Sequence, residues 1–195
     1  MKPIPIYQVD AFTRGPFTGN PAAVCVLTEP VGEETMQKIA MENNLAETAF
    51  ITRGSDEWLI RWFTPVTEVD LCGHATLASA FVVLTILEPE SSEAVFRSRT
   101  MGTLTVRRKG ELLELDFPTD TLRECAVPDL IRESIGKVPM ESYMGRSDYL
   151  LLFSTETDIL EMDPDFRKLA TADGRGVIVT APGSDVDFVS RFFAP

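Results

Sequence analysis

The sequence is poor in residues on which several classes of site depend. It contains a single histidine, His74, which excludes zinc signatures and facial-triad iron sites that need two histidine ligands. Its three cysteines, Cys25, Cys72 and Cys125, are an odd and widely spaced set. Such a set is typical of the reduced thiols of a cytoplasmic protein rather than of a disulfide framework. We therefore expect a cytoplasmic chain that holds no metal.

Motifs for common cofactors and for hydrolases are also missing. No GxGxxG or GxxxxGK[ST] segment occurs, so the sequence gives no support for a bound nucleotide, and we expect no cofactor. The chain has no GxSxG segment and no motif that pairs His74 with an acidic residue. A hydrolase centred on His74 therefore has little support.

Positive charge and long apolar segments are scarce. Lys and Arg number 18 against 30 Asp and Glu, and the net charge of -12 disfavours binding to nucleic acid or to an anionic membrane surface. The longest apolar run, residues 75–87, is too short to span a bilayer. The first residues, MKPIPIYQVDAF, contain no signal-peptide core. We therefore expect no nucleic-acid partner and no membrane partner.

What the chain does contain is an ordinary globular composition, with 44% hydrophobic and 25% charged residues among 195. This length suits one large domain or two small ones. The first part alternates apolar strand patterns with an amphipathic helix at residues 32–44. Trp58, Ile60 and Trp62 recur at strand spacing and predict a strand with one face in the core.

The most informative segment runs from His74 to Leu87, where nearly every residue is small or apolar. A helix that is apolar all round must be buried all round. In a chain of this size, only a sheet curled around the helix can cover it, and strands predicted on both sides of the helix in the sequence supply that sheet. We therefore predict a first domain over residues 1–117, with a mixed sheet around a central helix.

Residues 118–195 alternate strand and helix patterns again and are predicted to form a second, partial domain. A faint repeat links the two parts. RWFTP at 61–65 and RFFAP at 191–195 each close a strand rich in large apolar residues. The buried helix follows the first copy, whereas the given sequence stops after the second. The repeat suggests two related domains, the second without its central helix.

The start of the predicted central helix could carry chemistry. Gly73 lets the backbone approach a ligand closely, and the first N–H groups of a helix carry about half a positive charge, which attracts a carboxylate or an enolate oxygen. The same residues, with Asp70 before them and His74 after, are also typical of an ordinary helix start. The spacing alone favours that structural interpretation.

Glu47 and Asn20 are further candidates. Glu47 lies among small and apolar residues, where loss of solvation raises the pKa of a carboxyl group and suits a general acid/base. Taken by itself, it is more typical of a solvated surface residue. Asn20 could hydrogen-bond a substrate carboxylate or amide, or act only as a turn residue before Pro21. Cys72 is interpreted as a small buried apolar residue.

Several segments, in this order and spacing, resemble the PhzF-like proteins, the phenazine-biosynthesis isomerase family. They are GNPAAVC at 19–25, NLAETAF at 44–50, RWFTP at 61–65, DLCGHATLASA at 70–80, RGVIVTAPG at 175–183 and DFVSRFFAP at 187–195. The resemblance implies an α+β, diaminopimelate epimerase-like fold. In that fold two similar domains each wrap a mixed, barrel-like sheet around a central helix, and the active site lies in the cleft between them.

The resemblance also implies cofactor-independent proton transfer on a small carboxylate-bearing substrate, as in the isomerisation of a dihydro-hydroxyanthranilate. It implies that Glu47, in the family's N-L-x-E-T-A motif, is the general acid/base. Gly73 and His74, in its C-G-H-A-T motif, are implied to line the site. Asn20, in its G-N-P motif, is implied to lie near the substrate. A homodimer is the assembly that the resemblance suggests.

One departure from the family is large. The family continues after R-F-F-A-P into E-D-P-x-T-G-S-A, which opens the second central helix, and this motif is missing from the given sequence. We therefore expect the 195-residue chain to be catalytically inert and to associate through exposed apolar surface. The alternative function is that of an inactive, truncated family member that acts as a binding or scaffold protein.

Overall fold

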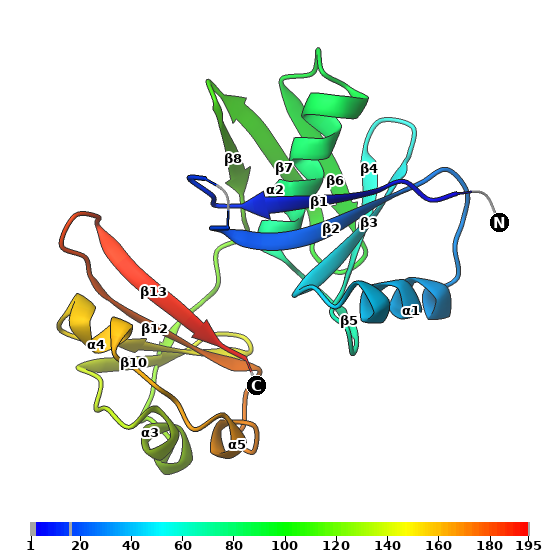
Figure 1. The fold of residues 1–195 in the computed structure, drawn as a ribbon. Coiled ribbons are helices and arrows are strands. Elements are labelled where there is room, and N and C mark those ends of the chain that lie inside the picture. Colours follow the sequence, from blue (N-terminus) through cyan, green and yellow to red (C-terminus); the bar gives the residue numbers. More distant parts are fainter. Residues whose placement is uncertain (1–2, 16, 195) are drawn as a thin grey trace. The chain divides into compact units, whose positions relative to one another are not determined.

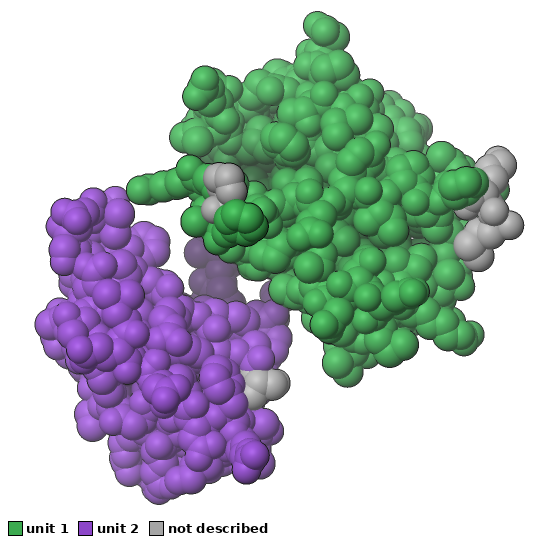
Figure 2. Space-filling model, in the orientation of Figure 1, with its two compact units in different colours: residues 1–118 green, residues 119–195 purple. Residues whose placement is uncertain are grey.

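The computed structural model describes residues 3–15 and 17–194. The chain divides into two compact units, residues 1–118 (unit 1) and residues 119–195 (unit 2), which are coloured separately in Figure 2. Each unit combines helices with a sheet, in agreement with the predicted α+β class. Within the described ranges, no helix has the length and apolar character needed to cross a membrane.

Unit 1 is built on a mixed sheet, as predicted. Its strands are β1 (Ile6–Ala11), β2 (Asn20–Leu27), β3 (Glu47–Arg53), β4 (Trp58–Phe63), β5 (Glu68–Val69), β6 (Glu93–Ser98), β7 (Gly102–Lys109) and β8 (Leu112–Asp116). The order in the sheet is β1-β2-β3-β4-β6-β7-β8, and β5 pairs with β4. The β2–β3 and β4–β6 pairs are parallel, whereas the other pairs are antiparallel.

The predicted central helix packs against the inner face of this sheet (Figure 1). It begins as α2 (Gly73–Val82) and continues as a π-helix, η1 (Val83–Leu87). Strand alternation turns Trp58, Ile60 and Trp62 of β4 toward it, and all three side chains are buried. The strand spacing read from the sequence is therefore confirmed.

The expectation that this helix is buried on every side is wrong. Phe81 is 46% exposed and Ile86 is 49% exposed. The reason is that β1 and β8, the two ends of the sheet, do not pair with each other in the described part of the chain. They leave a groove of about 580 Å³ that is lined by residues of both strands and by Leu77 and Phe81 of the helix.

Helix α1 (Glu33–Asn43) covers the opposite face of the sheet. Its residues Met36 and Ala40 pack with Cys25, Phe50 and Phe63 in a core separate from the one around α2. Successive residues of β2 and β3 therefore point alternately toward α1 and toward α2.

Unit 2 contains a smaller sheet. Its elements are β9 (Arg123–Glu124), α3 (Asp129–Ile135), β10 (Glu141–Met144), β11 (Asp148–Leu152), α4 (Glu156–Leu160), α5 (Phe166–Leu169), β12 (Gly176–Pro182) and β13 (Phe188–Phe193). The sheet order is β13-β12-β11-β10-β9, and only the β11–β12 pair is parallel among these described strands. Residues of α3, α4 and α5 form one core with the odd-numbered residues of the three strands β11 to β13.

Candidate active site

Glu47 is placed by the end of one helix and the start of the next strand. Asn44 ends α1 in a left-handed conformation, with φ 51°, and its N–H donates to the Ala40 carbonyl at 3.1 Å. Three residues later β3 begins at Glu47. Ala49 and Ile51, which have the same parity along the strand, pack in the core around α2. The Glu47 side chain is therefore on the face of the sheet that α2 covers.

Thr48, the next residue of β3, points to the opposite face of the sheet, toward α1. The Asn43 side-chain amide, at the end of α1, donates to Thr48 Oγ1 at 3.2 Å. This bond joins the last turn of α1 to the first residues of β3. It fixes the strand start that presents Glu47, and no feature of the sequence pattern pointed to it.

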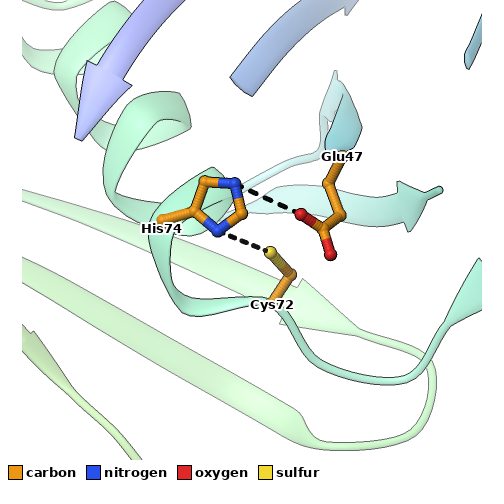
Figure 3. A group of neighbouring side chains, drawn as sticks. All are labelled: Glu47, Cys72 and His74. Carbon is orange, nitrogen blue, oxygen red and sulfur yellow. Dashed lines mark hydrogen bonds and ion pairs between the residues drawn. The ribbon is translucent and has the colours of Figure 1, made fainter. Parts of the chain in front are cut away.

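His74 lies in the first turn of α2, with its ring between two other side chains (Figure 3). Its Nε2 atom is 3.2 Å from Glu47 Oε2, and its Nδ1 atom is 3.4 Å from Cys72 Sγ. The side chains of His74 and Glu47 are 9% and 21% exposed. The structure thus brings together Glu47 and His74, two of the residues that the sequence singled out, and adds Cys72 as a direct neighbour.

Burial determines the charge of this histidine. Loss of solvation lowers the pKa of His74 below its ordinary value of 6.5, and hydrogen bonding to the backbone of Pro21 only partly opposes this effect. The ring is therefore neutral at neutral pH, with one N–H and one lone pair. Among the described residues, Nε2 has no partner in good hydrogen-bond alignment, so its contact with Glu47 is a close approach.

The N-terminus of α2 lies at the same place. Cys72 is the N-cap residue and is extended, but its side chain makes no capping hydrogen bond to the helix. Thr76 instead donates to the Cys72 carbonyl, from its N–H at 3.2 Å and from its Oγ1 at 2.6 Å. No acidic residue stands in the first turn. The positive end of the helix dipole is thus not neutralised by a side chain of that turn.

The structure gives a reason for glycine at position 73 that the sequence did not reveal. A Cβ atom at this position would lie 2.7 Å from a ring carbon of Phe117, just after the end of β8. Glycine is therefore needed because the Phe117 ring packs against the backbone at the helix start. The prediction that Gly73 admits a ligand stays a prediction, and Phe117 is a neighbour of the site that the sequence reasoning missed.

Asn20 is the first residue of β2, and Glu47 is the first residue of the parallel neighbour β3. The register pairs Ala22 with Glu47, so Asn20 lies at the same end of the sheet. It has the parity of Ala22, which packs in the α2 core. Its predicted contact with a substrate stays a prediction.

Glu47, Cys72 and His74 also contain three atoms of the types that bind metals, all within 4.8 Å of one another. In the arrangement drawn in Figure 3, however, the carboxylate faces one ring nitrogen and the thiol faces the other. An ion bound to either nitrogen would face only one of the two remaining groups. The geometry suits a chain of hydrogen-bonding groups better than a three-ligand metal site.

Comparison with known proteins identifies the family. The family model described as phenazine biosynthesis-like protein matches residues 9–195. The chain belongs to this phenazine biosynthesis-like family. An uncharacterized isomerase of Pseudomonas aeruginosa is 47% identical over 190 residues, which are 97% of this chain and 73% of that protein. The mouse phenazine biosynthesis-like domain-containing protein 1 is 37% identical, with 98% of this chain and 76% of that protein covered.

Solved structures confirm the fold predicted for this family member. A PhzF-family protein of Enterococcus faecalis superposes with a TM-score of 0.90 at 44% identity, over 98% of this chain and 74% of that one. A probable proline racemase of Agrobacterium radiobacter superposes with a TM-score of 0.60 at 8% identity, over 98% of this chain and 71% of that one, and therefore shows a shared fold alone. The predicted resemblance to PhzF-like proteins is confirmed by both kinds of comparison.

Proposed function

We propose that the chain carries the general acid/base, Glu47, of a cofactor-independent isomerase that moves a proton on a small carboxylate-bearing substrate. The observation that carries the proposal is the 3.2 Å contact between Glu47 Oε2 and His74 Nε2 at the start of α2. A carboxylate, a neutral imidazole and the positive end of a helix dipole meet at this point. Together they can accept a proton from carbon and stabilise the charge that remains.

The proposed reaction has two steps. The Glu47 carboxylate takes a proton from an activated C–H bond, and the bonding electron pair moves into the adjacent conjugated system as an enolate-like anion. The protonated Glu47 then returns the proton to another carbon, which regenerates the carboxylate. The N–H groups at the start of α2 would stabilise the anion. Asn20 would bind the substrate, and His74 would hold the Glu47 carboxylate in place.

The relatives support this activity over the alternative of an inactive binding or scaffold protein. The Pseudomonas aeruginosa relative and a relative from Halalkalibacterium halodurans, which is 42% identical, are both named uncharacterized isomerases. Both match nearly the whole of this chain, including the segments that carry Glu47 and His74.

The test follows incorporation of solvent deuterium into small carboxylates with an activated C–H bond, a dihydro-hydroxyanthranilate among them, by mass spectrometry. We expect Glu47→Gln to slow exchange by about 10²–10⁴-fold, because an amide cannot accept the proton. Glu34→Gln is the matched control, since Glu34 is exposed on α1 and pairs with Lys38 one turn away. That variant is expected to exchange at the unaltered rate.

Because the chain spans 73% of the Pseudomonas aeruginosa relative, the assay is run on two proteins. One is the 195-residue chain, and the other is a chimera that continues into the remaining part of that relative. Exchange by the chain alone would contradict the expectation that it is inert. A folded chimera that exchanges no substrate of the panel, or that exchanges equally well with Glu47→Gln, would contradict the proposed function.

A further inference from the structure

The mechanism leaves one contact of the site unused, that between His74 Nδ1 and Cys72 Sγ at 3.4 Å. This distance is within hydrogen-bonding range for sulfur, and both side chains are buried. Cys72 occupies the N-cap position, where a side chain usually bonds to an N–H of the first turn, yet it makes no such bond. Its thiol contacts the His74 imidazole instead of capping the helix.

The contacts of the His74 ring with Glu47 and with Cys72 are not independent. A neutral imidazole carries its proton on one nitrogen only, and the hydrogen bond made by one nitrogen decides which tautomer is present. An ionised carboxylate can only accept a hydrogen bond. Nε2 faces Glu47 Oε2 at 3.2 Å without an aligned hydrogen bond among the described residues, so an ionised Glu47 favours a proton on Nε2 but does not by itself fix it there. When Nε2 carries the proton, Nδ1 is the acceptor, and a thiol is able to donate to it.

We propose that Cys72 is a positioning residue that donates its S–H to His74 Nδ1 and so holds the tautomer in which Nε2–H faces the Glu47 carboxylate. In this role Cys72 acts through His74, the side chain that its thiol contacts. The proposal deepens the proposed function, since it explains how the carboxylate is oriented for proton removal. The tautomer itself, however, is a property of the resting protein and exists whether or not the chain is an isomerase.

The test uses the fact that the chain has one histidine. A long-range ¹H–¹⁵N correlation spectrum of the uniformly ¹⁵N-labelled 195-residue protein at neutral pH contains the two ring nitrogens of His74 alone. We expect Nε2 to be protonated and Nδ1 to be an acceptor. Cys72→Ala is expected to give a mixture of tautomers. Because Cys72 does not cap the helix, alanine at this position is compatible with the start of α2.

Two variants separate the contributions. Cys25→Ala removes the other fully buried thiol, which lies on the α1 side of the sheet and whose pKa burial raises to about 12, and it is expected to leave the tautomer unchanged. Glu47→Gln keeps the thiol and removes the carboxylate, and we expect the Nε2–H tautomer to persist. If the proposed function also holds, Cys72→Ala should lower kcat for deuterium exchange about fivefold with little change in KM, the effect of one neutral hydrogen bond.

Three results would overturn the proposal. The first is a wild-type spectrum in which Nδ1 carries the proton. This test does not depend on whether any variant folds. The second is an unaltered tautomer in Cys72→Ala. The third is a change of tautomer in Glu47→Gln, which would make the carboxylate the deciding group. If the spectra are as expected but the chimera exchanges no substrate, the result would count against the proposed function and leave the role of Cys72 standing.

Discussion

The sheets of unit 1 and unit 2 share a local arrangement at the end of one strand. At the end of β4, Arg61 lies over the ring of Phe63, with its guanidinium carbon 5.1 Å from the ring centroid. At the end of β13, Arg191 lies over Phe193 at 4.8 Å. These are the two copies of the RWFTP and RFFAP repeat. In each unit the phenylalanine packs with the helices on the outer face of the sheet.

The residue between the arginine and the phenylalanine shows where the units differ. Trp62 faces the core around α2 and is 1% exposed, whereas Phe192 is 49% exposed. The register places Phe192 in a row with Ile178 and Leu150 on the face of the unit 2 sheet that α3, α4 and α5 do not cover. The middle aromatic residue of the same strand ending is therefore buried in a core in unit 1, whereas in unit 2 it lies on an apolar, partly exposed face of the sheet.

This difference also bears on where the candidate site lies. In unit 1 the helix on the inner face brings its N-terminus, with His74, to the strand end that carries Glu47. In the described part of unit 2, the corresponding sheet face bears no helix and so presents no helix N-terminus. A candidate site therefore depends on the covered inner face rather than on the sheet alone.

The largest effect should come from truncating the two equivalent aromatic residues. We expect Trp62→Ala to lower the free energy of unfolding by about 3–5 kcal/mol, since it empties a fully buried site. Phe192→Ala removes a half-exposed ring that lies against Arg175 in a cation–π contact and over the backbone of Gly176, and should cost less than about 1 kcal/mol. Chemical denaturation followed by circular dichroism measures both values. Equal losses would show that the two faces are buried alike.

The same pair of variants tests the expected association. Because Phe192 belongs to an exposed apolar row, Phe192→Ala should reduce self-association of the chain in light scattering at a fixed concentration. A wild-type chain that is a monodisperse monomer would contradict this expectation.

A second, smaller effect concerns a glycine under an aromatic ring in each unit. A Cβ at Gly176 would lie 2.6 Å from the Phe192 ring and 2.8 Å from the Phe193 carbonyl oxygen, whereas a Cβ at Gly73 would meet only the Phe117 ring at 2.7 Å among its near neighbours. A ring can move, but a backbone carbonyl in a sheet cannot. We therefore expect Gly176→Ala to cost about 2–3 kcal/mol and Gly73→Ala about 1 kcal/mol.

Double variants sharpen this comparison. Adding Phe117→Ala should recover most of the stability lost in Gly73→Ala, because the ring is the obstacle. Adding Phe192→Ala should not recover the stability lost in Gly176→Ala, since the Phe193 carbonyl oxygen remains close to the new Cβ. Equal recovery in both units would show that only the rings matter. Thermal or chemical unfolding of the four proteins supplies the measurement.

Much of unit 1 could be predicted from the sequence because its elements are long and strongly patterned. The central helix is a run of mostly small and apolar residues, and Trp58, Ile60 and Trp62 mark a strand by their period. In unit 2 the strands β9 and β10 are short and contain no buried residue, so no period marks them. Helix α4 had a usable signal, the capping box formed by Thr155 and Asp158, which the sequence reading passed over.

The sequence named residues of the candidate site but did not reveal their contacts. Glu47 and His74 were singled out by neighbouring residues and by the family resemblance, yet residues so far apart in sequence give no local sign that they touch. The thiol of Cys72 reaches the imidazole because an extended N-cap residue precedes a helical turn, a matter of backbone geometry. Phe117 reaches Gly73 through the return of β8, which only the folded sheet determines.

The smallest effect is a pH dependence that belongs to unit 1 alone, since the single histidine lies there. Burial lowers the pKa of His74 below 6.5, and the ring faces Glu47, Cys72 and the backbone of Pro21. Above pH 6.5 the histidine is neutral in both the folded and the unfolded chain, so its full contribution to stability is present. Below that pH the unfolded chain binds a proton that the folded chain resists, and the free energy of unfolding falls until the pH passes the folded pKa.

Denaturant midpoints measured at intervals from neutral pH down to about one unit below the ordinary histidine pKa test this sign. The wild-type protein should lose stability across that window, whereas His74→Gln, which cannot take up the proton, should be flatter. An NMR titration of the His74 ring gives the folded pKa directly and should place it below 6.5. A parallel loss of stability in both proteins would mean that carboxylates elsewhere in the chain dominate the window. Unit 1 would then be no more sensitive to mild acid than unit 2.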